Sequence, residues 1–478
     1  MIVKLIQPSV QMRPMDTRLK TQMAPSLALW TLAALTPPEH TVVMENENTA
    51  PLRFDEAVDL VAITVTVDVL PRACEIAARY RAMGVPVVAG GIHVTCDPAG
   101  CAPFFDALCV GMAEPVWARI LADAQRGTLA PVYEGMDTMR GEQIASPAYR
   151  RMAEGPYLYT NIVTTSRGCP FQCDFCYNSS NKACLPYLER PIEDVLRDIQ
   201  AIGGRHILFV DDNFIGNPAR TRELLLRLKP LRLRWNAAVT ANLLQHLDLL
   251  DLMRESGCQS LFIGLESLHP GSLRDVHKGQ NHVERYDALI AEIHKRGIMV
   301  NASLVFGLDH DTPQCFEETY NYLVSRKVET VTAHILTPYP GTALYRRMLA
   351  QGRIVDRDLS HYNTAHVVFT PRSMTAAQLQ AGYLRFYKRF YSWRSILRRM
   401  PDARAQRVPY LLFNLLYRKF GRFTAALARL VPMRALGRLS SRWAYCGADR
   451  ARNARGGQSA APARQSELSA PGRLPTTR

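Results

Sequence analysis

Three cysteines crowd one short segment of the chain, the stretch TTSRGCPFQCDFCYNSS at residues 164–180. Cys169, Cys173 and Cys176 are separated by three and then two residues. Thiolates bind soft metals, and four of them complete a structural zinc site or the ligand set of an iron–sulfur cluster. Three thiolates on one loop leave one metal position open. We therefore predict a [4Fe–4S] cluster whose fourth iron is free to bind a substrate or a cofactor, with three buried structural thiols as the alternative.

The other cysteines of the eleven in the chain are scattered without a pattern. The nearest, Cys184, has no companion that would complete a zinc site. In a long chain without an export signal, scattered cysteines are more often reduced core residues than disulfides. The N-terminal sequence MIVKLIQPSV is too short and too strand-like for a signal peptide, and no apolar run approaches the ~20 residues of a membrane span. We therefore expect a cytoplasmic protein with free thiols.

The elements that must position the cysteine loop begin with an alternation of short apolar runs and helical stretches before residue 127. With 478 residues, 47% of them hydrophobic, the chain can form two or three domains with their own cores. The alternation predicts an α/β fold whose residues 1–127 form a Rossmann-like parallel sheet, followed by a linker at 128–159. The expected strands are 2–6, 40–44, 60–65, 85–89 and 107–110, and the expected helices are 25–35 and 70–83.

The connections that leave these strands carry candidate ligand-binding residues. In open α/β sheets, ligands bind outside the carboxyl ends of the strands. Thr64 lies at the end of the third expected strand, and Gly90 and Gly91 follow the fourth, where the lack of a Cβ lets a cofactor approach the backbone. The alternative for the two glycines is a tight strand-to-helix connection.

A second strand–helix series predicts a partial (β/α)6 barrel over residues 160–371. In parallel barrels the chemistry takes place at the carboxyl ends of the strands. The cysteine loop follows the first strand of the series, so the predicted cluster lies at that end of the barrel. The expected strands are 162–166, 206–210, 234–239, 260–264, 300–306 and 331–336, and the clearest helices are 192–202 and 286–296.

Polar residues and a glycine stand at the ends of several of these barrel strands. Carboxylate and amide oxygens there can accept hydrogen bonds from an ammonium group of a ligand. Capping of the following helix is the alternative for the residues after the second strand. The set comprises Asp211, Asp212 and Asn213 after the second strand, Glu266 and Ser267 after the fourth, and Gly307 after the fifth.

The spacing Cys-x3-Cys-x2-Cys, with Phe175 directly before the last cysteine, resembles the signature of the radical S-adenosylmethionine (SAM) superfamily. The resemblance implies that the open iron chelates SAM, and that an electron cleaves SAM to a 5′-deoxyadenosyl radical that abstracts hydrogen. It also implies that Asp212, Glu266 and Gly307 hold SAM. The superfamily commonly has a Gly-Gly-Glu segment where this chain has DDNF, so the chain departs from the pattern there.

The segments DDNF, GLES and TPYPGT, in this order at strand ends, resemble the cobalamin-binding branch of that superfamily, whose members include methyltransferases and relatives acting on lipids or tetrapyrroles. The resemblance covers roughly residues 1–371 and implies that the first domain binds cobalamin near Thr64, Gly90, Gly91 and His93. The Asp-x-His-x-x-Gly element that supplies an axial histidine elsewhere is absent. We therefore expect cobalamin to bind without a histidine ligand, and His93 is not assigned to cobalt.

The implied cofactors are a [4Fe–4S] cluster, SAM and cobalamin, and the first hypothesis is an enzyme that methylates an unactivated carbon of a lipid-like or other secondary metabolite. An electron donor such as flavodoxin or ferredoxin would supply the electrons. The second hypothesis keeps the cofactors and changes the reaction to cyclisation or oxidation, as in anaerobic tetrapyrrole cyclases. A zinc or iron–sulfur binding module is a third class, disfavoured because such a module has no need for ordered, polar strand ends.

Positive charge is concentrated at the C-terminus. Residues 373–478 contain 21 Lys and Arg against three acidic residues, a net charge of +18, so the remainder of this +15 chain carries −3. We expect a basic helical region at 372–447 and a disordered tail at 448–478. The stretch VPYLLFNLLYRKFGRFTAALARLV fits either peripheral contact with the inner membrane surface or a helix packed on the barrel. No nucleic-acid-binding module accompanies the charge, so we expect no nucleic-acid partner.

Overall fold

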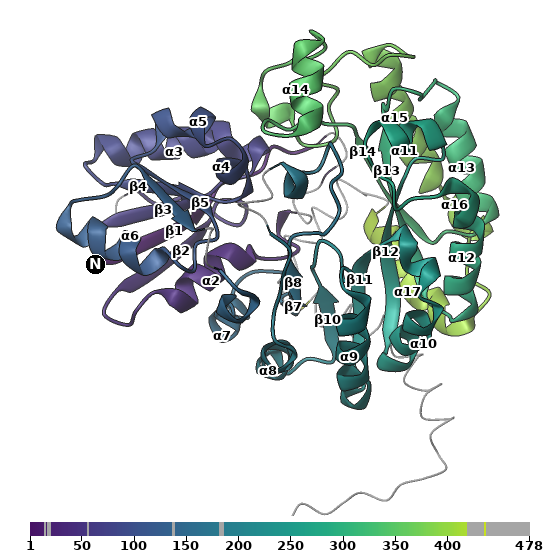
Figure 1. Cartoon of the computed structure of the whole chain (residues 1–478), viewed down its shortest axis with the longest axis horizontal. Helices are drawn as coiled ribbons and strands as arrows, with labels where there is room; N and C mark the ends of the chain where they lie inside the picture. The colour runs from purple at the N-terminus through teal and green to yellow at the C-terminus, as the bar shows by residue number, and fades with distance from the viewer. Residues whose placement is uncertain are drawn as a thin grey trace, which may run out of the picture.

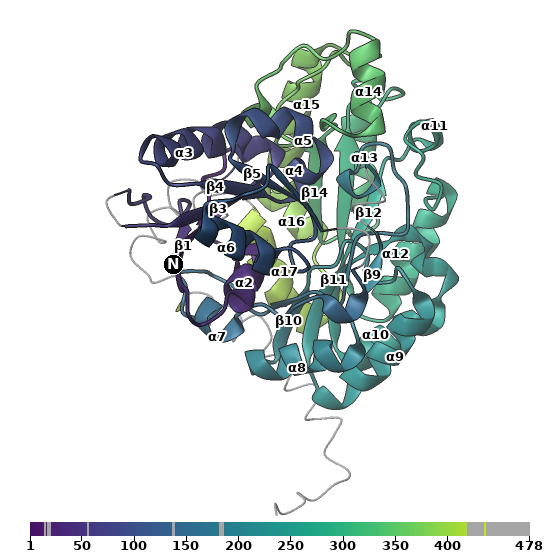
Figure 2. The ribbon, with the colours of Figure 1, turned by 60° about the vertical axis from the view of Figure 1, so that its left-hand side comes forward.

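The computed structural model describes residues 1–13, 16, 21–54, 57–135, 139–180, 186–417 and 435. Two six-stranded parallel sheets, each with its own helices, lie next to each other in the molecule. The N-terminal sheet is on the left of Figure 1 and the second sheet is on the right, and Figure 2 shows both units after a turn of 60°. The predicted α/β class with two parallel sheets is confirmed.

The first sheet is fully parallel, with the strand order β2-β1-β3-β4-β5-β6. Its strands are β1 (Ile2–Gln7), β2 (Thr41–Asn46), β3 (Leu60–Thr64), β4 (Val87–Gly90), β5 (Ala107–Gly111) and β6 (Val132–Gly135). The helices of this unit are α2 (Leu27–Leu35), α3 (Leu70–Ala82), α4 (Ile92–Cys96), α5 (Pro98–Cys101) and α6 (Trp117–Arg126). The Rossmann-like sheet predicted for this part of the chain is therefore present.

Alternate residues of the central strands supply two separate cores, one on each face of the sheet. In β3, Leu60 and Ala62 pack in the core that contains Leu29 of α2. The residues between them, Val61 and Ile63, belong to the core on the α3 side. Because both faces are covered by helices, β3, β4 and β5 are almost wholly apolar, and the sequence shows this continuous pattern.

Strand β6 lies inside the segment that the sequence analysis assigned to a linker, residues 128–159. It pairs in parallel with β5, from Leu108 opposite Val132 to Gly111 opposite Gly135. Its sequence VYEG buries only every second residue, as expected for a strand at the edge of a sheet. The search for apolar runs missed it for that reason. The linker assignment is corrected to this extent, and the short helix α7 (Tyr149–Met152) follows it.

The second sheet forms the partial barrel, with the strand order β14-β13-β12-β11-β10-β7 and all neighbours parallel. Its strands are β7 (Ile162–Val163), β10 (His206–Phe209), β11 (Arg234–Thr240), β12 (Cys258–Glu266), β13 (Met299–Phe306) and β14 (Thr330–Ile335). A short antiparallel pair, β8 (Ser166–Arg167) with β9 (Leu188–Glu189), flanks the cysteine loop. The helices are α8 (Ile192–Ile202), α9 (Pro218–Leu228), α10 (Leu247–Ser256), α11 (Pro270–Asp275), α12 (Tyr286–Lys295), α13 (Cys315–Ser325) and α14 (Ala343–Ala350).

The C-terminal helices cover the open edge of this sheet. They are α15 (Ala376–Phe390), α16 (Trp393–Arg398) and α17 (Arg404–Tyr417). The hydroxyl of Tyr387 accepts from Ala333 N (2.7 Å) and donates to Ala333 O (3.0 Å), and Tyr391 makes the same two bonds with Val331 (3.0 and 2.7 Å). Unpaired edge strands are prone to pair with other chains. Two tyrosines therefore occupy backbone groups of β14 that a seventh strand would otherwise use.

A fully buried arginine fastens the C-terminal helices to the barrel. Arg399 donates to the backbone oxygens of Val328 (2.9 Å), Glu329 (2.6 Å) and Phe390 (2.8 Å), and to Asn414 Oδ1 (3.2 Å) in α17. The beginning of the basic region is thus packed on the barrel. The expectations for the rest of that region and for residues 448–478 fall outside the described residues. In the part of the chain that is described, no helix combines the length and hydrophobicity required to span a bilayer.

Candidate functional site

The cysteine loop lies between β8 and β9, at the carboxyl end of the first barrel strand, as predicted. Cys173 is buried, whereas Cys169 and Cys176 are half-buried, and none of the three forms a disulfide. The amide of Cys176 donates to Cys173 O (3.0 Å) and closes a turn. Asp174 anchors the loop from outside, because its carboxylate pairs with Arg347 (2.6 Å) of α14 and lies 2.8 Å from His277 Nδ1. The loop that carries the thiols is therefore held by contacts from α14 and from His277.

The arrangement of the thiols suits a cluster better than a single ion. Among the residues that the structure describes, no three His, Cys, Asp or Glu side chains converge on one metal-sized position. A single zinc ion needs its ligands in one shell, whereas a [4Fe–4S] cluster binds each cysteine through a different iron atom and so keeps the thiolates apart. The donor set, three thiolates on one turn at residues 169–176, fits the cluster.

Asp211 and Asp212 position the entrance to this loop. Asp211 Oδ1 accepts from the amide and hydroxyl of Thr165 (2.9 and 2.8 Å) and of Ser166 (2.5 and 2.7 Å). Asp212 Oδ2 accepts from Gly168 N (3.0 Å), the residue before Cys169. Burial raises the pKa of Asp211, and the four donors oppose that rise. The two carboxylates thus tie the end of β10 to the strand that leads into the cysteines.

Two buried polar atoms at this strand end have no partner among the described residues, Asp211 Oδ2 and Asn213 Nδ2. The other amide atom of Asn213, Oδ1, accepts from Ile215 N (3.4 Å). A buried acceptor and a buried donor without partners are costly unless a ligand or water pairs with them. They fit the ammonium and carboxylate groups of an amino acid such as the methionyl part of SAM, and the assignment of these residues to SAM remains a prediction.

Glu266 ends β12 in a left-handed conformation, with φ of 63°. Its carboxylate receives the buried Lys278 ammonium at 2.7 Å, and this ammonium lies 5.8 Å from the ring centroid of Phe175 in the cysteine loop. Gln280 Nε2 reaches Cys173 Sγ at 3.7 Å. The structure therefore brings Glu266 and Phe175 together through a lysine that the sequence analysis did not identify, and it places positive charge beside the cysteines.

Ser267 and Gly307 have local roles in the structure. Ser267 Oγ accepts from His269 N (3.0 Å). Gly307 has φ of 94°, and a Cβ there would lie 2.7 Å from Leu379 Cδ2 of α15. The glycine is thus required by its conformation and by the close packing of a C-terminal helix, a reason that differs from the expected approach of an adenine. A direct role of either residue in SAM binding stays a prediction.

A cavity of about 570 Å³ lies between the two sheets, within the ~300–1,000 Å³ range of ligand pockets. One wall consists of the carboxyl ends of β3, β4 and β5 with helix α2, and it includes Thr64, Gly90 and Gly91. The opposite wall is the cysteine loop and the end of β10, contributing Tyr177 and Asp212. Three of the predicted cofactor residues of the first domain, Thr64, Gly90 and Gly91, therefore line a cavity that also borders the cysteine loop.

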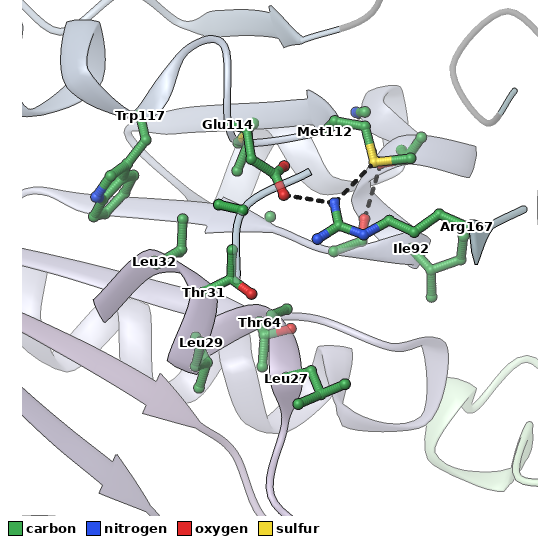
Figure 3. Close-up of a pocket in the computed structure, with 18 of the residues that line it drawn as sticks. Leu27, Leu29, Thr31, Leu32, Thr64, Ile92, Met112, Glu114, Trp117 and Arg167 are labelled. Carbon is green, nitrogen blue, oxygen red and sulfur yellow. Dashed lines mark hydrogen bonds and ion pairs between the residues drawn. The ribbon is translucent and has the colours of Figure 1, made fainter. Parts of the chain in front are cut away.

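An ion pair crosses this cavity between the two walls. Arg167, two residues before Cys169, places Nη1 2.7 Å from Glu114 Oε1 and 3.4 Å from Met112 Sδ, as Figure 3 shows. The Glu114 side chain is buried. The sequence displayed the acidic loop after β5 but gave no signal that a residue 53 positions later would pair with it, because such contacts depend on the packing of the two sheets.

His93 lies outside the cavity lining and faces the cysteine loop. It is fully buried, and its Nδ1 is 3.2 Å from the hydroxyl of Tyr177. Burial lowers the pKa of His93. The ring of Tyr177 stacks on Tyr339 of the TPYPGT segment, with centroids 4.5 Å apart. His93 is therefore positioned as a contact between the two units, and neither tyrosine was singled out from the sequence.

His334, on β14, gives the fold a sensitivity to acid. Its Nδ1 is 3.0 Å from Thr364 Oγ1, and burial together with nearby Arg13 lowers its pKa to about 4. Because the unfolded-state pKa is about 6.5, protonation favours unfolding, so stability is lost as the pH falls through 6.5 towards 4. We expect protonation of His334 to lower the free energy of unfolding by about 2 kcal/mol between pH 7 and pH 5. Urea unfolding of wild type and His334→Asn at both pH values measures this, and equal losses in the two proteins would contradict it.

Comparison with known protein families agrees with this architecture. Residues 163–323 match the model of the Radical SAM superfamily, and residues 342–440 match a domain of unknown function, DUF4070. The barrel of the chain is therefore similar to the radical SAM superfamily. A Rossmann-like domain precedes this barrel, which is the arrangement expected from the resemblance to the cobalamin-binding-domain branch of these enzymes.

Two curated relatives and one solved structure define its neighbourhood. Bacteriochlorophyllide d C-12(1)-methyltransferase of Chlorobaculum tepidum is 29% identical over 352 residues, 72% of this chain and 76% of the relative. Hopanoid C-2 methylase of Rhodopseudomonas palustris is 29% identical over 349 residues, 70% of this chain and 66% of the relative. The cobalamin-dependent SAM radical enzyme OxsB, solved with aqua-cobalamin bound, aligns with a TM-score of 0.62 at 14% identity, over 91% of this chain and 76% of that chain. At this identity the structural likeness establishes the fold.

Proposed function

We propose that this protein is a cobalamin-dependent radical SAM enzyme that methylates an unactivated carbon of a small molecule. The observation that carries the proposal is the cavity between the sheets, because one of its walls is the carboxyl edge of a Rossmann-like sheet and the other is the cysteine loop. When bound, the cluster with SAM would supply a hydrogen-abstracting radical and cobalamin would supply the methyl group. The chain's own contribution is to hold these groups close together.

The cavity fits cobalamin without a histidine ligand. Among the described residues that line it there is no histidine, and its walls are mainly apolar with Thr31, Thr64 and Thr95 among the polar groups. The relatives support methyl transfer, since both curated names describe methylation at a numbered carbon, of bacteriochlorophyllide d in one and of a hopanoid in the other. OxsB, which shares the fold, binds cobalamin. We therefore infer a lipid-like or other secondary metabolite as the substrate.

Two partners complete the proposal. The cluster must receive electrons from outside the chain, and a reduced flavodoxin or ferredoxin is the class of donor that we propose. The basic C-terminal region is proposed to bring the protein to the inner surface of the membrane, where an apolar substrate would be concentrated.

The decisive experiment is anaerobic reconstitution with iron, sulfide and hydroxocobalamin, followed by turnover with SAM labelled in its methyl group. About four irons and one cobalamin per chain support the cofactor assignment. Label in the product requires a methyltransferase, whereas product formation without label assigns the chain to the cyclase or oxidase type. Four irons without retained cobalamin would contradict the role of the cavity.

A substitution inside the cavity tests where cobalamin binds. Thr31 of α2 is buried and lines the cavity (Figure 3), so Thr31→Trp would fill it with an indole ring. We expect retained cobalamin to fall at least about tenfold with iron unchanged, because the ring occupies the corrin's place. Ala34→Trp, exposed on the same helix, is the matched control. Absorbance after desalting measures the bound cobalamin, and equal retention in both variants would place cobalamin elsewhere.

A further inference from the structure

Helix α16 (Trp393–Arg398) carries an unusual exposed face. Trp393 and Leu397 are 48% and 62% exposed, values that are high for large apolar side chains in a folded domain. Arg394 and Arg398 are exposed beside them. Residues four apart lie on the same side of a helix, so an apolar stripe and a basic stripe run next to each other. These four residues are called the α16 surface below.

The α16 surface is rigidly held from beneath. Ile396, on its inner side, is fully buried with Tyr410 of α17, whose hydroxyl donates to Ile396 O (2.6 Å). Arg399 follows directly and is fixed by the hydrogen bonds described above. The exposed side chains are therefore presented on a fixed base, so that docking does not require the helix to form first.

The charge around this surface is not neutralised by neighbouring acids. Asp402 is the only acidic residue in 373–417, and it pairs with Lys327 (2.7 Å). Within the part of the chain that the structure describes, no carboxylate pairs with Arg394 or Arg398. The sequence continues after residue 417 with further basic and apolar residues, so the surface lies at the start of the segment that carries +18.

We propose that the α16 surface docks on an anionic lipid bilayer. Tryptophan and leucine beside arginine suit the boundary between headgroups and acyl chains, where the apolar rings insert and the guanidinium groups meet phosphates. A nucleic acid would use the arginines but has no need for two exposed apolar side chains at helical spacing. This inference deepens the membrane contact proposed above by locating it, and it does not depend on the chemistry of the cofactors.

Vesicle flotation of the reconstituted full-length protein tests the surface. Wild type is expected to float with phosphatidylcholine vesicles containing one quarter phosphatidylglycerol, and to bind pure phosphatidylcholine at least about tenfold more weakly. Trp393→Ala/Leu397→Ala and Arg394→Glu/Arg398→Glu are each expected to weaken binding to the anionic vesicles about tenfold or more.

The matched controls expose similar side chains elsewhere on the molecule. Leu349 and Val355 are 47% and 62% exposed, so Leu349→Ala/Val355→Ala removes the same kind of apolar area. Arg274→Glu/Arg285→Glu reverses two exposed arginines of the barrel. Both controls should bind vesicles like wild type. Equal binding by the α16 variants and wild type, or a protein that ignores vesicles and retains single-stranded RNA, overturns the proposal. Iron and cobalamin contents measured in parallel report on the enzyme assignment independently.

Discussion

Serine in place of Cys173 is expected to empty the cluster site, with iron falling from about four atoms per chain to near zero. A [4Fe–4S] cluster held by three thiolates cannot spare one, because the serine hydroxyl is a far poorer ligand for iron and Cys173 is the buried member of the set. Without a cluster there is no route for the electron that cleaves SAM, so formation of 5′-deoxyadenosine should fall at least ~1,000-fold. Iron and sulfide analysis and the quantitation of 5′-deoxyadenosine measure the two effects.

Cys315→Ser is the matched control for the loss of one thiol. Cys315 is half-buried at the start of α13, outside the cysteine loop, and burial raises its pKa well above the ordinary value of a thiol. It should therefore behave as a neutral core residue, and its variant should keep its iron. Wild-type iron content in Cys173→Ser, with far-ultraviolet circular dichroism showing both variants folded, would refute the cluster assignment.

The second large effect is expected at Arg399, where methionine should lower the free energy of unfolding by about 3–5 kcal/mol. The guanidinium satisfies three backbone carbonyls and one side-chain amide in a fully buried position. Methionine has a similar length but no donor, so Val328 O, Phe390 O and Asn414 Oδ1 would each lose their bond to Arg399, and Glu329 O would keep only its bond from Asn414 Nδ2 (3.1 Å). The end of the barrel and α17 should separate as a result. Urea unfolding and limited proteolysis around residues 399–417 report the two consequences.

Arg398→Met isolates the contribution of burial. Arg398 is the neighbouring residue and is exposed, and its replacement by methionine is the same chemical change. Its substitution should alter the free energy of unfolding by less than about 0.5 kcal/mol. If the two variants were equally stable, the bonds of Arg399 would add nothing beyond those available to any surface arginine, and the fastening role would be wrong.

The fold could be predicted closely because its strands are continuous apolar runs. The ranges expected for β3, β11 and α8 agree with the structure to within one residue. A strand that is buried on both faces needs apolar residues at successive positions, so its limits can be read from the sequence. Strand β6 escaped because it is half-polar at an edge. The short pair β8 and β9 escaped because two-residue strands have no periodicity to detect.

Some residues of the candidate site could be predicted from the sequence and others could not. The three cysteines and the loop glycines could be identified from their type and spacing. The structure brings Gly90 and Gly91 to the cavity that borders the cysteine loop. The residues that complete the site could not be identified in this way, because a lysine beside Glu266 or an arginine opposite Glu114 has no local sequence pattern. Such pairs are set by tertiary packing between distant segments. Gly307 is the opposite case, because the sequence suggested a role in ligand binding and the structure explains the glycine by the packing of α15.

The cysteine loop carries the three thiols predicted to hold the cluster and also forms one wall of the cavity proposed for cobalamin. Damage to one cofactor should consequently spread to the other. If oxygen destroyed the cluster, the loop would lose its proposed bonds to iron, and Arg167 and Tyr177 would be held less firmly against the first domain. Oxidation of the cluster would then weaken the binding of cobalamin. The cluster would therefore have to be assembled before the corrin could be held tightly.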